Sequence, residues 1–183
     1  MTVTLDGMNG GSRIVVGICR VPDDAVAVTG ITDSRGNTYT DLEIDGTADL
    51  ASAQTWVGTS TDNTSDPVDM TIAFSGAGAN GLDVRVVEYA LVSELGDVEA
   101  NDGNGTHGVT ATVDVDTLPT LVVMSSCVSS SVLAVNGFTE DARDANGNVM
   151  ASKLADATGP WTLELTQINE GGMILDVVPL VGL

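Results

Sequence analysis

The chain has 183 residues, 43% of them hydrophobic, which is enough for one folded domain or two small sandwiches and argues against a disordered chain. Asp and Glu number 26 against 6 Lys and Arg, so the formal net charge is −20. A surface this acidic repels phosphates, which excludes nucleic acid as a direct partner and disfavours an anionic membrane surface.

The acidic residues are spread along the chain in ones and twos, and the only lysine is Lys153. Self-repulsion among them would destabilise the fold at low ionic strength, whereas at molar salt the Debye length falls to about 3 Å and screens it. Few lysines together with many Asp and Thr residues resemble the composition of haloarchaeal proteins. The composition therefore predicts a salt-adapted host, the other interpretation being an acidic marine or mesophilic protein.

Two segments bear on targeting. Residues 1–13 have neither a basic region nor an apolar run before a cleavage site, so we expect a chain made and used without conventional export. Residues 117–139 form the longest uncharged stretch, but Pro119 and several serines interrupt it. It predicts a buried strand and a turn, with no membrane insertion.

Short runs rich in Val, Ile and Thr recur between clusters of Gly, Asn, Asp and Pro, and no segment keeps a helical apolar stripe. The predicted strands are Thr2–Leu5, Arg13–Arg20, Ala25–Asp33, Thr38–Ile44, Ala53–Ser60, Val68–Phe74, Leu82–Leu91, Thr106–Val115, Leu121–Val128, Val135–Glu140, Val149–Leu154, Trp161–Thr166 and Gly172–Val181. This inventory is typical of an all-β fold, an antiparallel double-sheet sandwich of the jelly-roll or Ig-like kind.

We expect residues 1–183 to form a single sandwich domain, or else two halves, 1–94 and 109–183, joined by residues 95–108. That connection is the longest polar one and predicts a crossover or an exposed functional loop. Turns at Ser34–Asn37 and Asn146–Asn148 predict hairpins. In residues 82–90 the apolar alternation slips at Val86 and Val87, which indicates a bulge or a strand buried on both faces.

Cys19 and Cys127 lie within apolar runs and are either buried thiols or one inter-strand bridge. Without export, buried thiols are the favoured interpretation. His107 is the only histidine and lies in a Gly-rich segment without a nucleophile motif such as G-x-S-x-G, so a surface position is expected. We therefore predict neither a catalytic residue nor a zinc site, and a chain that is not an enzyme.

Calcium is the one cofactor that the sequence leaves open, because oxygen ligands are crowded in two segments. The candidate ligands are Asp97, Glu99 and Asp102, near Asn101 and Asn104, and Asp141 and Asp144, near Asn146 and Asn148. Neither segment has the spacing of an EF-hand loop. Carboxylate-rich loops are also expected in any chain this acidic, which is the favoured interpretation.

The aromatic supply for a sugar platform is small: Trp56, Trp161, Tyr39 and Tyr89. Each is expected to pack in the core or between sheets, with Trp161 the most exposed of them because it follows Gly159 and Pro160.

Six segments carry a resemblance, in the order GITDSRGNTYT, AQTWVGTST, MTIAFSG, LDVRVVEYALV, LPTLVVMSS and GFTEDARD. Together they resemble a β-sandwich (jelly-roll-like) domain of phage and archaeal-virus structural proteins and of large bacterial surface proteins. The resemblance covers most of the chain, and its motifs are structural. It implies a sandwich fold and a role in a particle or on a surface.

The hypothesis that follows is a non-enzymatic virion protein of a salt-adapted, haloarchaeal-like host: a capsid decoration, a turret or a tail-associated component. It would be assembled in the host cytoplasm as a symmetric homo-oligomer in contact with other virion proteins. The unusually apolar C-terminal segment supplies the candidate interface, the other interpretation being a last core strand. The candidate interface residues are Met173, Ile174, Leu175, Val177, Val178 and Leu180.

The alternative hypothesis is a carbohydrate- or surface-binding module of a cell-envelope protein, located at the cell surface. It predicts an exposed aromatic platform.

Overall fold

The structure, a computed structural model, describes residues 1–20, 26–43, 46–48, 51–76 and 81–182. It is all-β with antiparallel sheets that are not closed into a barrel, consistent with the predicted sandwich. The strands are β1 Thr2–Leu5, β2 Arg13–Arg20, β3 Val28–Asp33, β4 Thr38–Asp41, β5 Gly46–Ala48, β6 Ala51–Thr59, β7 Val68–Phe74, β8 Asp83–Tyr89, β9 Val92–Leu95, β10 Glu99–Val115, β11 Thr120–Val128, β12 Val132–Ala134, β13 Thr139–Arg143, β14 Val149–Leu154 and β15 Gly159–Gly182.

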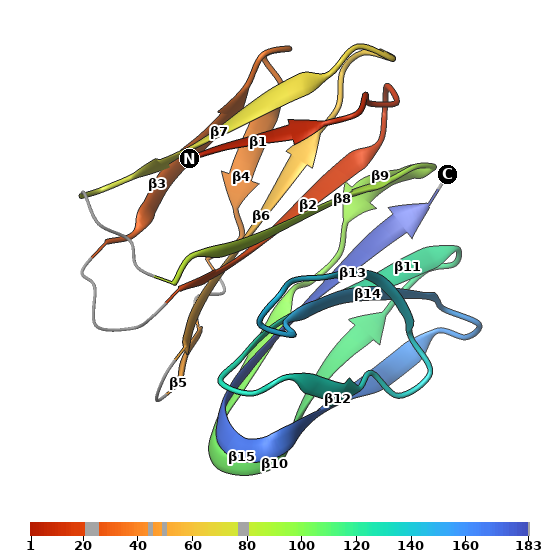
Figure 1. Cartoon of the computed structure of the whole chain (residues 1–183). Helices are drawn as coiled ribbons and strands as arrows, with labels where there is room; N and C mark the ends of the chain where they lie inside the picture. The colour runs from red at the N-terminus through yellow and green to blue at the C-terminus, as the bar shows by residue number, and fades with distance from the viewer. Residues whose placement is uncertain (21–25, 44–45, 49–50, 77–80, 183) are drawn as a thin grey trace.

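Strands β1 to β8 form a first sandwich, drawn in red to yellow-green in Figure 1. One sheet has the order β1-β7-β3 and the other β4-β6-β2-β8, with β5 paired to β6. Alternate residues of β7, Val68, Met70 and Ile72, are buried and meet Ile14 and Trp56 of the facing sheet. This period of two is the pattern expected when one face of a strand is buried.

Strands β9 to β15 form a second sandwich in which β10 and β15 belong to both layers. The end of β10, residues 108–115, pairs with residues 159–166 of β15 in one layer, while residues 173–181 of β15 pair with β11 in the other layer. Between these parts the register of β10 shifts twice, at residues 103–108, and the pair bends sharply there (Figure 1). Register shifts of this kind let a strand change direction.

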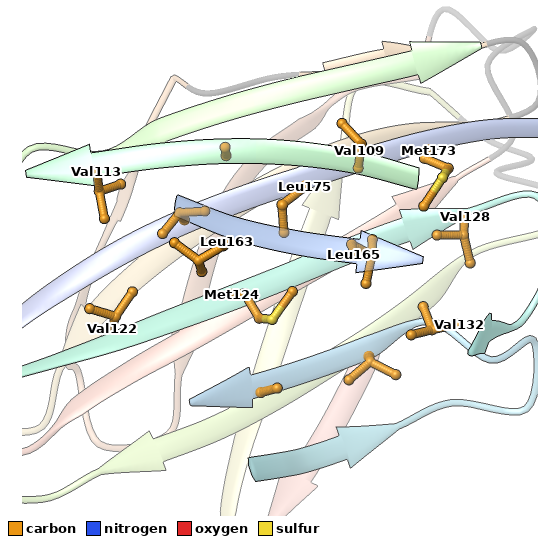
Figure 2. Close-up of a cluster of buried hydrophobic side chains, with 14 of the residues drawn as sticks. Val109, Val113, Val122, Met124, Val128, Val132, Leu163, Leu165, Met173 and Leu175 are labelled. Atoms are coloured by element: carbon orange, nitrogen blue, oxygen red, sulfur yellow. The ribbon is translucent and has the colours of Figure 1, made fainter. Parts of the chain in front are cut away.

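Aliphatic side chains from both layers fill the core of the second sandwich (Figure 2). Val109 and Val113 of β10 and Leu163 of β15 face Met124 of β11 and Leu175 of the returning half of β15. Except for the partly buried Phe138 and Trp161 beside it, this cluster has no aromatic side chain. Packing therefore depends on many aliphatic contacts.

The two sandwiches pack against each other through a third apolar layer. Val15 of β2 and Val57 of β6 meet Val123 of β11 and Val178 of β15. Strand β2 is consequently buried on both faces along almost its whole length. A Cβ atom on Gly17 would lie 2.3 Å from Oγ of Ser125 on β11, so this close approach of two strands requires glycine.

Several sequence predictions are confirmed to the residue: Thr2–Leu5, Arg13–Arg20, Val68–Phe74 and Val149–Leu154. The slip at Val86 and Val87 comes from a strand that packs on both faces and not from a bulge. Val86 packs into the first sandwich and Val87 into the layer between the sandwiches, while β8 stays in register with β2. Two predicted strand residues, Ala25 and Ile44, lie outside the described residues.

Three predictions about the limits of strands and loops are wrong. Most of the expected polar loop 95–108 is strand, because β10 begins at Glu99 and pairs with β15. The expected strands Trp161–Thr166 and Gly172–Val181 are parts of the single strand β15. The expected strand Val135–Glu140 is interrupted by a turn, with β12 before it and β13 after it.

The two predicted hairpins share one turn, Asp-x-x-Gly-Asn, at residues 33–37 and 144–148. In each, the aspartate carboxylate accepts hydrogen bonds from the backbone N–H of the residues two and four positions on, at 2.9–3.1 Å, and the glycine has a positive φ. Only the second turn closes a hairpin, β13–β14. The first connects two sheets, because β3 pairs with β7 and β4 pairs with β6.

Candidate functional site

The carboxylates proposed as calcium ligands do not converge. Asp97, Glu99 and Asp102 are exposed at and before the start of β10. Asp97 lines a small pocket of about 30 Å³ together with Asp114 and Asp116. Among the described residues, no group of three or more His, Cys, Asp and Glu side chains is arranged to hold a metal ion.

The other two proposed ligands have structural partners. Asp141 accepts a hydrogen bond of 2.7 Å from the hydroxyl of Tyr89, and burial together with this carboxylate raises the pKa of Tyr89. The Asp144 carboxylate holds the second turn and also accepts from Nδ2 of Asn148 at 2.9 Å. The carboxylates of Asp141 and Asp144 are therefore hydrogen-bonded to other groups of the protein.

In the first turn, residues 33–37, the aspartate Asp33 likewise binds protein groups. Asp33 accepts from the hydroxyl of Tyr39 at 2.7 Å and from Nδ2 of Asn37 at 2.8 Å. Burial acts to raise the pKa of Asp33, but the hydrogen bonds from Tyr39, Asn37 and Arg35 outweigh it, so the pKa is lowered. Burial and the bond to Asp33 raise the pKa of Tyr39.

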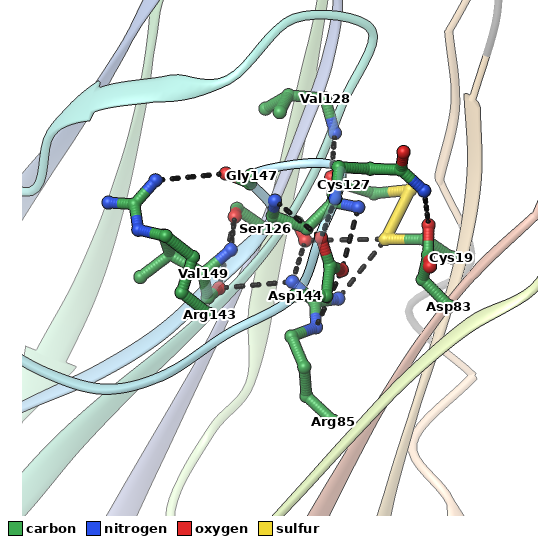
Figure 3. Close-up of polar contacts among 12 residues, drawn as sticks. Cys19, Asp83, Arg85, Ser126, Cys127, Val128, Arg143, Asp144, Gly147 and Val149 are labelled. Atoms are coloured by element: carbon green, nitrogen blue, oxygen red, sulfur yellow. Dashed lines mark hydrogen bonds and ion pairs between the residues drawn. A yellow bond between two sulfur atoms is a disulfide. The ribbon is translucent and has the colours of Figure 1, made fainter.

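Arg85 on β8 is a buried cation between the two sandwiches (Figure 3). Nη1 donates to the carbonyl oxygens of Ser126 and Val149, and Nη2 contacts Sγ of Cys19 at 3.1 Å. Nε lies 3.9 Å from Oδ2 of Asp144. One guanidinium thus connects β2, β11, β14 and the second turn.

Arg85 remains charged in this buried cluster. Burial lowers its pKa to about 10, against the opposing effect of the carboxylates of Asp144 and Asp176, so the side chain stays protonated at neutral pH. Asp176, on β15, is itself buried and accepts a hydrogen bond of 2.6 Å from the hydroxyl of Thr55. The cluster balances the buried positive charge with carboxylates and links strands of the two sandwiches. It is buried too deeply to contact a substrate.

Cys19 of β2 and Cys127 of β11 form a disulfide beside Arg85, with their Cα atoms 5.5 Å apart. The favoured sequence interpretation, buried thiols, is therefore wrong, and the inter-strand bridge is correct. The expectation of thiols rested on the absence of an export signal, which says nothing of how closely two strands approach. The bond joins the first sandwich to the second.

An apolar pocket of about 290 Å³ opens at the end of the second sandwich. Its lining comes from the β8–β9 connection, the start of β11 and the ends of β14 and β15. The lining residues are Ala90, Leu91, Val92, Pro119, Leu121, Leu154 and Gly182, and none is charged.

Exposed leucines surround this pocket. Leu91 is 79% exposed, Leu154 is 60% exposed, and Leu118, next to the lining residue Pro119, is 48% exposed. Leu91 also has a φ of 61°, a left-handed conformation that costs a non-glycine residue energy and occurs preferentially at functional positions. These three leucines and the pocket are called the leucine pocket below.

The residues proposed as an interface lie elsewhere. Their side chains are all buried inside the chain, where they contribute to the cores of the second sandwich and of the layer between the sandwiches. Burial by the chain's own strands agrees with the other interpretation, a last core strand, and leaves these side chains no surface for a partner. The residues concerned are Met173, Ile174, Leu175, Val177, Val178 and Leu180.

The aromatic residues do not form an exposed platform. Trp56, Tyr39 and Tyr89 are buried, and Trp161 is half-buried against the core of the second sandwich. Nζ of Lys153 lies 5.1 Å from the centre of the Trp161 ring, a cation–π contact. His107 is exposed, with Nε2 3.6 Å from the carboxylate of Glu170.

Sequence reasoning missed Arg85 and the leucine pocket. Arg85 alternates with Val84 and Val86, so its face of β8 reads as solvated until a second sandwich covers it. The apolar Val87, which is partly buried in the layer between the sandwiches, was the available signal. The pocket has no local signal, because its lining comes from four separate segments.

The described residues include no helix long and apolar enough to cross a membrane.

Comparison of the chain with protein-family models, with curated proteins and with solved structures finds no match. The all-β fold with several antiparallel sheets agrees with the resemblance described above at the level of architecture, and no family is identified.

Proposed function

We propose that the chain is a non-enzymatic structural protein of a virus particle from a salt-adapted host, such as a haloarchaeon. The observation that carries the proposal is the leucine pocket, an uncharged apolar site at one end of a chain with a net charge of −20. On so acidic a body, an apolar area without carboxylates is where subunits associate with the least charge repulsion. An apolar side chain of a neighbouring subunit of the particle is the proposed occupant.

The architecture supports the same role. Two sandwiches held together by an apolar layer, a disulfide and a buried arginine make one stiff body, as a particle component requires. The polar cluster around Arg85 is used for connection, as are Asp33, Asp141 and Asp144. The alternative, a carbohydrate-binding module, depends on an aromatic platform, and three of the four candidate rings are buried.

The incorporation of pocket variants into particles tests the proposal. In infected host cells that express an epitope-tagged chain, we expect Leu154→Asp to be lost from purified particles, because a carboxylate at the pocket rim cannot be buried against an apolar partner. Ile168→Asp is the matched control, since Ile168 is 54% exposed and does not line the pocket. Equal incorporation of both variants would contradict a role for the pocket, and absence of the unmodified chain from particles would contradict the proposed function.

Salt should stabilise the fold if the host is salt-adapted. The melting temperature is expected to rise steadily as KCl increases from about 0.1 M to about 3 M, because the repulsion among carboxylates becomes screened. A triple variant, Asp6→Asn, Asp62→Asn and Asp156→Asn, removes three charges at exposed positions and should show a smaller rise. Circular dichroism gives both curves. A melting temperature that stays level or falls with KCl would rule out this part of the proposal.

A further inference from the structure

Strand β10 has an open edge that differs from the other sheet edges. Residues 108–115 pair with β15 on one side, in unbroken register from Gly108↔Thr166 to Val115↔Gly159. Within the part of the chain that the structure describes, no strand pairs with the other side. Because successive residues of a strand direct their N–H and C=O groups to opposite edges, half of these groups face away from β15.

Proteins protect open edges with short strands, charges, prolines or bulges. The other edge strands that are described here have such protection: β1 and β4 have four residues each, and β3 has a register shift. Strand β13 contains Glu140, Asp141 and Arg143, and β8 contains Asp83, Arg85 and Glu88. From Gly108 to Val113, β10 has no charged residue, no proline and no register shift.

The side chains of this edge alternate strictly. Val109, Ala111, Val113 and Val115 are buried in the core of the second sandwich, whereas Thr110, Thr112 and Asp114 are exposed. An added strand must keep this alternation, because a shift of one residue would place polar side chains over the core.

We propose that this edge pairs antiparallel with the same edge of a second copy of the chain, which joins two β10–β15 layers into one sheet. A two-fold axis at Thr112 would place Thr112 opposite Thr112, Thr110 opposite Asp114 and Val109 opposite Val115. Inward residues then face inward residues in both copies, so the apolar layer continues across the axis.

The edge is complementary to itself about Thr112, which makes a second copy the proposed occupant. Although both chains are strongly acidic, this register places each Asp114 opposite a threonine hydroxyl, and no carboxylate faces another across the new ladder. The Thr110 carbonyl already accepts a hydrogen bond of 2.5 Å from Nδ2 of Asn101, and a carbonyl oxygen has a second lone pair for the new strand.

Cysteine cross-linking tests the pairing and its register. The native cysteines are joined to each other, so an introduced thiol is the only free one among the described residues. At molar KCl and with a mild thiol oxidant, Thr112→Cys is expected to give a cross-linked dimer of twice the 18.7 kDa chain mass, because cross-strand neighbours have Cβ atoms about 5 Å apart. Thr110→Cys, the matched control, should give none, while Thr110→Cys mixed with Asp114→Cys should cross-link.

Analytical ultracentrifugation of the unmodified chain adds a readout that needs no introduced cysteine. A concentration-dependent dimer that is lost in Thr112→Lys, where two like charges would face each other, supports the proposal. A monomer at every concentration, or equal cross-linking of Thr112→Cys and Thr110→Cys alone, would overturn it. The result is independent of the proposed function, because a chain that is monomeric in solution can still be found in particles.

Discussion

Replacement of Arg85 by alanine is expected to lower the free energy of unfolding by about 3–5 kcal/mol, the range for breaking a buried ion pair by removal of one partner. The variant leaves Asp144 facing a cavity and removes the donors to the carbonyl oxygens of Ser126 and Val149. Because the side chain connects both sandwiches, the loss should appear as one cooperative transition. Denaturant unfolding followed by the fluorescence of the buried Trp56 measures it.

Two further variants isolate the cause. Arg85→Lys retains the charge but lacks the planar fork that reaches several acceptors, so an intermediate loss is expected. Arg35→Ala removes a surface ion pair, in which Nη2 of Arg35 lies 3.2 Å from Oδ2 of Asp66 and the Asp66 side chain is mostly exposed. The free energy of unfolding is therefore expected to fall by less than about 1 kcal/mol. If Arg85→Ala were no more harmful than Arg35→Ala, the buried cluster would have no special part in stability.

Reduction of the disulfide between Cys19 and Cys127 is expected to destabilise the chain by about 2–5 kcal/mol, because the bond closes a long loop and restricts the unfolded chain. The two residues are separated by 108 positions and lie in different sandwiches, so the loop is near the upper end of the range for which such restriction is large. Thermal unfolding with and without a phosphine reductant measures the difference.

The double variant Cys19→Ala and Cys127→Ala provides the control, since its stability should not respond to the reductant. Both sulfur atoms are buried, so reduction requires opening of the layer between the sandwiches and should be slow under native conditions. Unchanged stability of the reduced wild-type chain would show that the apolar layer alone holds the two sandwiches together.

The sequence was sufficient for the class of fold and for strands with a clear boundary. Strand β7 alternates without interruption from Val68 to Phe74, and turn residues flank it, so its limits could be predicted. The polar residues 99–103 of β10 have no such pattern, and they are strand because β15 pairs with them. Tertiary pairing can therefore extend a strand through a sequence that favours a loop.

The functional surfaces were harder to predict because they depend on contacts between distant segments. The C-terminal apolar run around Leu175 suggests an interface by its composition, but two neighbouring strands, β10 and β11, and the layers on either side bury it. The leucine pocket needed the ends of four separate elements, and Arg85 became buried only when the second sandwich covered β8. A period of two identifies faces of a strand, but it does not tell which of two faces meets water.

The location of the chain in its host tests the proposed function most directly. An antibody raised to the chain would be used to probe purified virus particles, cell envelope and cytosol from the native host at equal protein load. The proposal predicts a strong signal in the particles, enriched over cytosol and absent from the envelope of uninfected cells. A signal in the envelope with none in the particles would contradict it and would make a surface-binding module the leading hypothesis.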